Sequence, residues 1–182
     1  MGEIKKLMIY YTDPVIIIRT IAETDPAVIA AEEVAQGWIH ATADKYLKRL
    51  EDHRNGISVA LIAEYRGQTA GYLNVYWDMD PGPFAGKPFP ELVDFGVLEK
   101  FRRKGIGTKL MDIAEQLAAE RADTVYLGVG LHSGYGSAQR MYVRRGYLPD
   151  GSGVWYDDSL AVPYQSYPND DSLILYFSKK LR

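Results

Sequence analysis

The stretch that decides the fold runs from Val97 to Thr108 and reads VLEKFRRKGIGT. A strand-like run, Glu91–Leu98, leads into it, and apolar residues at helical spacing follow it from Thr108 to Ala122. The start of a helix offers free N–H groups and a positive dipole end, and both favour phosphate binding. Residues 102–108, which we call the glycine loop, are therefore predicted to bind an anion.

The glycine loop lies in a strongly basic stretch that holds a single acid, Glu99. We expect Gly105 and Gly107 to let the backbone approach the ligand closely. A dinucleotide-binding fingerprint would need a third glycine where Leu110 stands, and the Gly-Lys-Ser/Thr of a P-loop is absent. These two nucleotide-binding classes are therefore excluded. The basic residues of the stretch are Lys100, Arg102, Arg103, Lys104 and Lys109.

Periodicity and turn residues predict the remaining elements. Upstream we expect a strand at 15–18, helices at 25–37 and 42–55, and a hairpin of strands 57–65 and 69–77 around a turn at 66–68. Downstream we expect an irregular loop at 78–90, a strand at 125–129, a helix at 136–145, a long polar and aromatic segment, and a last strand at 172–178. This order predicts an α/β fold with a mixed, mostly antiparallel sheet and helices on both faces.

Length and composition narrow the function classes. The chain has 182 residues and a formal charge of −3, which suits one domain spanning residues 1–182. Since there is no Cys, disulfides, thiolate metal sites and a Cys nucleophile are excluded. The small excess of Asp and Glu over Lys and Arg argues against a nucleic-acid partner. The apolar run Val15–Ile18 is far shorter than the about 20 residues of a membrane helix, so we expect a cytoplasmic protein without a membrane partner.

A second motif, Ala138–Tyr147, reads AQRMYVRRGY. It is expected to form a helix that carries a Tyr and closes with Gly-Tyr. The first motif, Arg102-x-x-Gly105-x-Gly107, follows a strand. Together, the two motifs resemble those of the GNAT superfamily of N-acetyltransferases. The resemblance covers Ile16 to Tyr147 in element order and Glu91 to Tyr147 in motifs. It implies a GNAT-like acyl-CoA N-acyltransferase fold, one N-acetyltransferase domain and acetyl-CoA as co-substrate, and it is compatible with a homodimer.

The resemblance also implies where CoA binds. The glycine-loop amides and the helix start would hold the pyrophosphate, and the strand backbone near Val97 would pair with the pantetheine arm. Arg103 stands where many members have Gly, and Tyr135 stands where Asn is common. No metal is expected, because the three histidines lack ligand spacing. The expected cofactor-binding residues are Phe95, Val97, Arg102, Arg103, Lys104, Gly105, Ile106, Gly107, Thr108 and Tyr135.

Acetyl transfer to an amine needs a base. An amine of pKa about 10.4 is protonated at neutral pH, and freeing its lone pair costs about 4 kcal/mol without assistance. Glu91 stands where some family members have a glutamate base, and strand alternation puts it on the face of Phe95 and Val97, with Asp94 facing away. Glu91 would take the proton directly or through water. The alternative is a solvated carboxylate at the start of a strand.

Tyr142 is the expected general acid, which would protonate the departing CoA thiolate. The alternative is a core tyrosine beside Ala138 and Met141. The sequence has neither a Cys nor a Gly-x-Ser-x-Gly motif, so we expect direct transfer in a ternary complex rather than an acyl-enzyme.

Two other classes of function remain open. One is a non-catalytic acyl-CoA sensor, which would keep the glycine loop but not transfer the acyl group. The other is a nucleic-acid binder, whose affinity would fall steeply with salt. The basic residues available to such a binder are Arg102, Arg103, Lys104, Arg140, Arg144 and Arg145.

The segment from Asp150 to Asp171 suggests the acceptor. It holds five Asp and no Lys or Arg. Its aromatic residues are Trp155, Tyr156, Tyr164 and Tyr167, and an earlier loop adds Trp77, Asp78 and Asp80. Acidic and aromatic side chains together suit a small cationic amine, whereas the alternative is a solvated loop whose aromatics cover a sheet edge.

Overall fold

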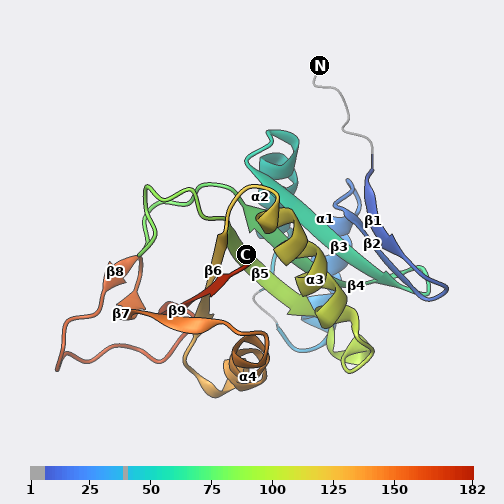
Figure 1. Cartoon of the computed structure of the whole chain (residues 1–182). Coiled ribbons are helices and arrows are strands. Elements are labelled where there is room, and N and C mark those ends of the chain that lie inside the picture. Colours follow the sequence, from blue (N-terminus) through green and yellow to red (C-terminus); the bar gives the residue numbers. More distant parts are fainter. Residues whose placement is uncertain (1–6, 39–40) are drawn as a thin grey trace. The chain divides into compact units, whose positions relative to one another are not determined.

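The computed structural model describes residues 7–38 and 41–182 (Figure 1). The chain forms two compact units, which we describe in turn. Unit 1 comprises the described residues up to Tyr76 and the segment Val93–Leu117. Unit 2 comprises Trp77–Leu92 and Ala118–Arg182.

Unit 1 is built on an antiparallel run of strands. They are β1 (Ile9–Thr12), β2 (Ile16–Thr20), β3 (Ser58–Tyr65) and β4 (Gln68–Tyr76), each paired with the next. Most of β5 (Glu91–Val97) follows beside β4. Arg66 and Gly67, with φ of 50° and 76°, form the two-residue turn between β3 and β4. Left-handed residues are typical of hairpin turns, because they match the twist of the strands.

Helices cover both faces of the unit 1 sheet. On one face, α1 (Asp25–Ala35) and α2 (Ala43–Arg54) bury Ile29, Tyr46 and Leu50 against Ile62 and Tyr72 of the strands. On the other face lies α3 (Ile106–Ala119), which follows the short 3-10 helix η1 (Glu99–Phe101). In the view of Figure 1, α3 lies in front of the strands and α1 behind them. The predicted two-sided arrangement is confirmed.

The strands of unit 2 include the first two residues of β5, Glu91 and Leu92. These pair in parallel with β6 (Thr124–Gly130), and β6 pairs antiparallel with β9 (Leu173–Lys180). β9 pairs with β7 (Leu148–Tyr156), which forms a hairpin with β8 (Ser159–Leu160). The 3-10 helix η2 (Ser133–Tyr135) and α4 (Gly136–Arg144) connect β6 to β7. The mixed, mostly antiparallel character is therefore confirmed.

The expected elements are present, and three features differ. The sequence does not predict β1, because four residues at an edge carry little periodicity. The segment after Tyr147 is not irregular throughout but forms β7 and β8. Helix α3 begins at Ile106 instead of Thr108, so its first turn lies inside the glycine loop. None of the described helices is long and apolar enough to cross a membrane.

Candidate active site

The glycine loop of unit 1 connects η1 to α3 through a left-handed backbone. Arg103 has a φ of 60° and Gly105 a φ of 80°. The Arg102 guanidinium donates from Nε to the carbonyl of Val97 at 3.3 Å and pairs with Glu99 at 3.3 Å. These contacts hold the start of the loop against the end of β5.

The loop leaves a run of backbone donors unsatisfied. Within the described residues, the N–H groups from Arg103 to Thr108 have no hydrogen-bond partner, and the helical ladder begins where Lys109 donates to Gly105. The side chains from Arg102 to Gly105 are exposed, so the loop faces solvent. Consecutive free amides at a helix start fit the oxygens of a pyrophosphate. The loop geometry thus suits a phosphate-bearing ligand.

The two loop glycines have different roles. A Cβ on Gly107 would lie 3.1 Å from the ring of Phe95 and 3.4 Å from Val97, so this glycine allows α3 to pack on β5. A Cβ on Gly105 would meet open space, and its left-handed φ is the reason for glycine there. The close contact of Gly107 with Phe95 and Val97 is a packing reason for this glycine, and the approach of a ligand to the two glycines stays a prediction. Ile106 is buried, which leaves only its backbone for a ligand.

Most basic side chains around the loop already contact other groups. Lys100 pairs with Glu32 at 2.7 Å. The Lys104 ammonium lies 5.3 Å from the ring centre of Tyr65, and that of Lys109 lies 4.4 Å from the ring centre of Tyr11. The main chain is therefore the principal source of free donors in the loop.

Strand β5 is interrupted at Asp94, whose φ of 52° is left-handed. Beyond it, Phe95 and Val97 face the start of α3. The Asp94 carboxylate instead accepts a hydrogen bond from Arg49 of α2, and a Cβ on Gly96 would collide with Tyr72, on the side of α1 and α2. Because the alternation breaks at Asp94, the argument that placed Glu91 on the face of Phe95 and Val97 does not hold.

Glu91 lies in unit 2, directly opposite Tyr126 in the parallel ladder. It is 9% exposed and accepts a hydrogen bond from the Tyr126 hydroxyl. Burial and then the Glu91 charge raise the pKa of Tyr126. Tyr126 contacts Tyr176 of β9, with ring centres 6.1 Å apart. The sequence does not single out either tyrosine, because each lies in a mostly apolar strand with the pattern of a buried core strand.

Tyr142 lies on α4 and is 6% exposed. Its ring packs edge-on against Tyr147, with centres 5.8 Å apart. Burial and then the proximity of Tyr135 raise the pKa of Tyr142. The phenol therefore keeps its proton at neutral pH, as a general acid must.

Tyr135 belongs to η2, next to α4. Its hydroxyl donates to Asp171 at 2.9 Å, and its ring lies 4.6 Å from that of His132. His132 accepts from the Gly134 amide at Nδ1, so its Nε2 carries the proton that bonds to Asp171 at 2.9 Å. The cofactor role implied for Tyr135 stays a prediction.

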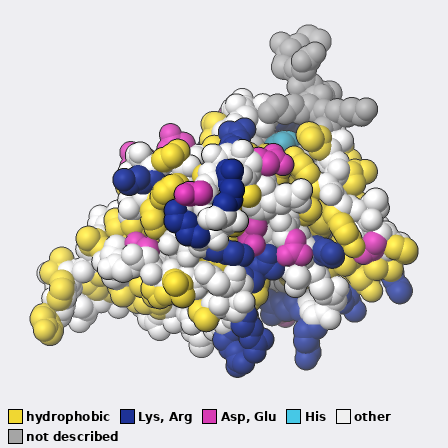
Figure 2. Space-filling model, in the orientation of Figure 1, with side chains coloured by type: hydrophobic (Ala, Val, Ile, Leu, Met, Phe, Trp, Pro, Cys, Tyr) yellow, Lys and Arg dark blue, Asp and Glu magenta, His cyan; other side chains and the backbone are white. Residues whose placement is uncertain are grey.

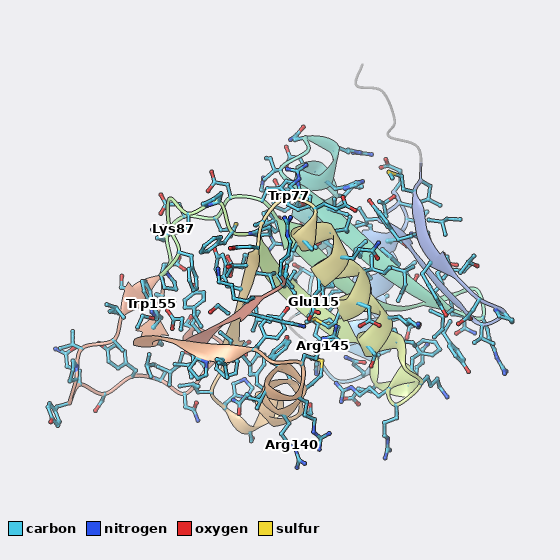
Figure 3. The ribbon with its side chains drawn as sticks, in the orientation of Figure 1. Trp77, Lys87, Glu115, Arg140, Arg145 and Trp155 are labelled. Carbon is cyan, nitrogen blue, oxygen red and sulfur yellow. The ribbon has the colours of Figure 1, made fainter. Side chains whose placement is uncertain are left out.

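The acidic and aromatic segment from Asp150 to Asp171 includes most of β7 and all of β8 in unit 2. Asp157 and Asp158, with φ of 45° and 62°, are the two central residues of the β7–β8 turn. Tyr156 packs against Tyr167 at 5.2 Å, whereas Tyr164 is fully exposed. Trp77, labelled in Figure 3, has the Arg121 guanidinium carbon 3.8 Å from its ring centre, so Arg121 covers one face of the ring.

A separate groove of about 440 Å³ lies along α4 and strands β6 and β9. Arg140 and Arg144 line it, and Figure 3 shows Arg140 at the outer side of α4. Figure 2 shows Lys and Arg side chains at the lower edge of the visible face. The groove's other walls are mostly apolar, which does not suit a phosphate backbone. Those apolar residues are Val129, Leu131, Val143, Leu175 and Phe177.

No group of three or more metal-binding side chains occurs within residues 7–38 and 41–182; His40 lies outside the described residues.

Comparisons with known proteins agree with this geometry. A protein of the GNAT family from Desulfovibrio desulfuricans has a TM-score of 0.69 at 14% identity, covering 92% of this chain and 99% of its own. The yncA protein of Salmonella typhimurium, solved with its cofactor acetyl-CoA, has a TM-score of 0.64 at 16% identity, covering 92% and 95%. An aminoglycoside 6'-N-acetyltransferase complexed with coenzyme A has a TM-score of 0.63 at 18% identity, covering 91% and 97%.

These identities are low, so the structural matches establish the fold alone. The comparison with curated proteins finds no match. The sequence model of the Acetyltransferase (GNAT) family, however, matches residues 23–147, which include the glycine loop and both motif helices. The chain therefore belongs to the GNAT acetyltransferase family.

Proposed function

We propose that this protein transfers the acetyl group of acetyl-CoA directly to a primary amine within a ternary complex. The observation that carries the proposal is the run of unpartnered amides from Arg103 to Thr108 at the start of α3. Family membership supports acetyl-CoA as the co-substrate.

The glycine loop is the part of the chain that would hold the CoA pyrophosphate. Its amides supply donors, and the dipole of α3 adds a positive potential at the same point. Val97 and Phe95, at the end of β5, would lie along the pantetheine arm. When bound, acetyl-CoA supplies the acetyl group as a reactive thioester.

Glu91 and Tyr142, both in unit 2, are the proton-transfer residues of the proposal. Glu91 takes a proton from the acceptor ammonium, directly or through a water molecule, and so frees the nitrogen lone pair for attack on the acetyl carbon. Tyr142 donates its phenolic proton to the sulfur as the carbon–sulfur bond breaks. As the intermediate collapses, the nitrogen loses its second proton to the Tyr142 phenolate, directly or through a water molecule. Glu91 releases its proton to bulk solvent, so the enzyme recovers its starting state and one proton is released for each amine acetylated.

The acceptor that we propose is a small cationic amine. Glu91 shares unit 2 with the acidic segment from Asp150 to Asp171, which holds no Lys or Arg. A cationic acceptor gains from this negative potential, whereas an acidic acceptor is repelled.

The test is a screen for release of the CoA thiol from acetyl-CoA with polyamines, aminoglycosides, amino acids and peptide N-termini. We expect turnover with cationic amines and none with acidic ones. Saturable CoA binding without turnover of any amine would instead identify the chain as an acyl-CoA sensor. A steep, salt-dependent affinity for an oligonucleotide, without turnover, would support the nucleic-acid alternative.

A further inference from the structure

A set of side-chain contacts fixes the start of α4, the helix that carries Tyr142. Tyr135 directly precedes this helix, and its ring lies against Gly130 at the end of β6, where a Cβ would collide with it. In the first turn of α4, Gln139 donates from Nε2 to the Gly130 carbonyl at 2.8 Å. Two residues at the start of the helix are therefore attached to the same point of β6.

Asp171 holds the far end of the Tyr135 side chain. The Tyr135 hydroxyl donates to Oδ1 of Asp171 at 2.9 Å, and Nε2 of His132 bonds to the same oxygen at 2.9 Å. The His132 ring packs on that of Tyr135, with centres 4.6 Å apart, and its Nδ1 accepts from the Gly134 amide at 3.0 Å. Asp171 lies 36 residues after Tyr135, just before β9. One carboxylate oxygen from a distant segment thus fixes both rings.

These contacts bear on Tyr142 because of its place on α4. Tyr142 comes seven residues after Tyr135, which is about two helical turns, so the two tyrosines lie on one face of the helix. Burial and then the proximity of Tyr135 raise the pKa of Tyr142, so the two phenols are close enough to interact. Since its backbone hydrogen bonds keep a helix rigid, a displaced first turn also displaces Tyr142.

We propose that Asp171 is a positioning residue for acetyl transfer, which holds Tyr135 and with it the start of α4, so that the Tyr142 hydroxyl meets the departing sulfur. This inference rests on the proposed function, because it takes Tyr142 as the general acid. In this role Asp171 needs an acceptor oxygen and not a charge. A misplacement of about 1 Å in a reacting group slows a reaction by up to about 10²-fold.

Two substitutions at position 171 separate the acceptor oxygen from the charge. Asp171→Ala removes both, whereas Asp171→Asn removes the charge and keeps an oxygen that accepts from the Tyr135 hydroxyl. Asp171 also belongs to the acidic segment that we propose attracts the acceptor, so this separation is necessary. Tyr135→Phe removes the donor of the same hydrogen bond and leaves the Asp171 charge in place.

The first measurement is thiol release at saturating acetyl-CoA and 1,4-diaminobutane. We expect Asp171→Ala and Tyr135→Phe each to lower kcat about fivefold to fiftyfold, and Asp171→Asn to keep it within about twofold. The KM of acetyl-CoA should not change in Asp171→Ala. A rise in the KM of the diamine should be equal in Asp171→Ala and Asp171→Asn, because it follows the lost charge.

A double variant tests whether Asp171 acts through Tyr142. In protein that carries Tyr142→Phe, Asp171→Ala should lower kcat no further, because the hydroxyl that it positions is already gone. Equal losses of kcat in Asp171→Ala and Asp171→Asn would overturn the positioning role. A full additional loss in the double variant would also overturn it.

A second measurement does not depend on turnover. In protein with ¹³C-labelled tyrosine, the NMR signal of Tyr142 is assigned by its loss in Tyr142→Phe. We expect it to shift in Asp171→Ala and Tyr135→Phe and to stay in place in Asp171→Asn. An unchanged signal in Asp171→Ala would overturn the proposal. The expected shifts without acetylation of any amine, or with a wild-type rate in Tyr142→Phe, would support the hold of Asp171 on Tyr142 and contradict the proposed function.

Discussion

The Arg49 guanidinium of α2 donates from Nε to the Asp94 carboxylate at 2.6 Å, and Asp94 is the residue at which β5 turns left-handed. Arg49 also donates to the Tyr76 hydroxyl at 2.6 Å, and Tyr76 donates to the buried Asp52. A helix of unit 1 thus fixes the irregular point of the strand that leads to the glycine loop.

Removing this guanidinium should destabilise unit 1. Arg49→Met leaves Asp94 and Tyr76 without their shared donor, so we expect a loss of about 1–3 kcal/mol in the free energy of unfolding by urea. Arg54→Met is the control, because Arg54 pairs with Glu23 at an exposed position, and its loss should stay below about 0.5 kcal/mol. Equal losses would mean that Arg49 does not hold β5.

The left-handed φ of Arg103 predicts which substitutions the glycine loop tolerates. Arg103→Gly and Arg103→Val both remove the guanidinium, but only Gly adopts a φ of 60° without strain. We expect Arg103→Gly to keep the CoA affinity within about twofold and Arg103→Val to weaken it about tenfold, as measured by calorimetry. Similar losses in the two variants would show that the side chain, not the backbone, binds CoA.

Tyr142→Phe should leave CoA affinity intact and slow the transfer by about 10²–10⁴-fold, because it removes only the proton donor. Tyr147→Phe removes a hydroxyl from the ring next to it and should keep the wild-type rate. Since the pKa of Tyr142 is raised, the wild-type rate should not fall through its ionisation below pH of about 10. An unchanged rate in Tyr142→Phe would assign this tyrosine to packing.

Glu91→Gln should move the rate maximum to higher pH. A neutral amide cannot take the proton from the ammonium, so the variant must wait until solvent deprotonates the amine, whose pKa is about 10.4. Tyr126→Phe keeps the carboxylate and removes only its hydrogen bond, so it should move the rate maximum much less than Glu91→Gln does. An unchanged profile in Glu91→Gln would assign the base to water or to another carboxylate.

The sequence was sufficient for the parts of the site that depend on local pattern. The strand, the basic stretch and the helix around Gly105 follow from periodicity and from glycine chemistry. Strand β7 could not be predicted in this way, because Gly151 and Gly153 interrupt its alternation and a bulge shifts its register between Pro149 and Val154. The extra residue in a bulge removes the period of two on which strand prediction depends.

The roles of individual residues depended on contacts that sequence spacing does not encode. The left-handed conformation of Asp94 breaks the alternation on which the placement of Glu91 beside Phe95 and Val97 depends. The packing of Gly107 on Phe95 depends on the approach of α3 to β5. Glu91 lies opposite Tyr126 only because β5 and β6 pair in parallel.

Direct acetyl transfer is tested most directly with acetyl-CoA labelled in its acetyl group and 1,4-diaminobutane as acceptor. The account predicts that the label appears on an amine nitrogen in equal amount to the CoA released, that no label stays on the protein, and that Tyr142→Phe slows both processes alike. Label retained on the protein, or CoA released without an acetylated amine, would contradict it.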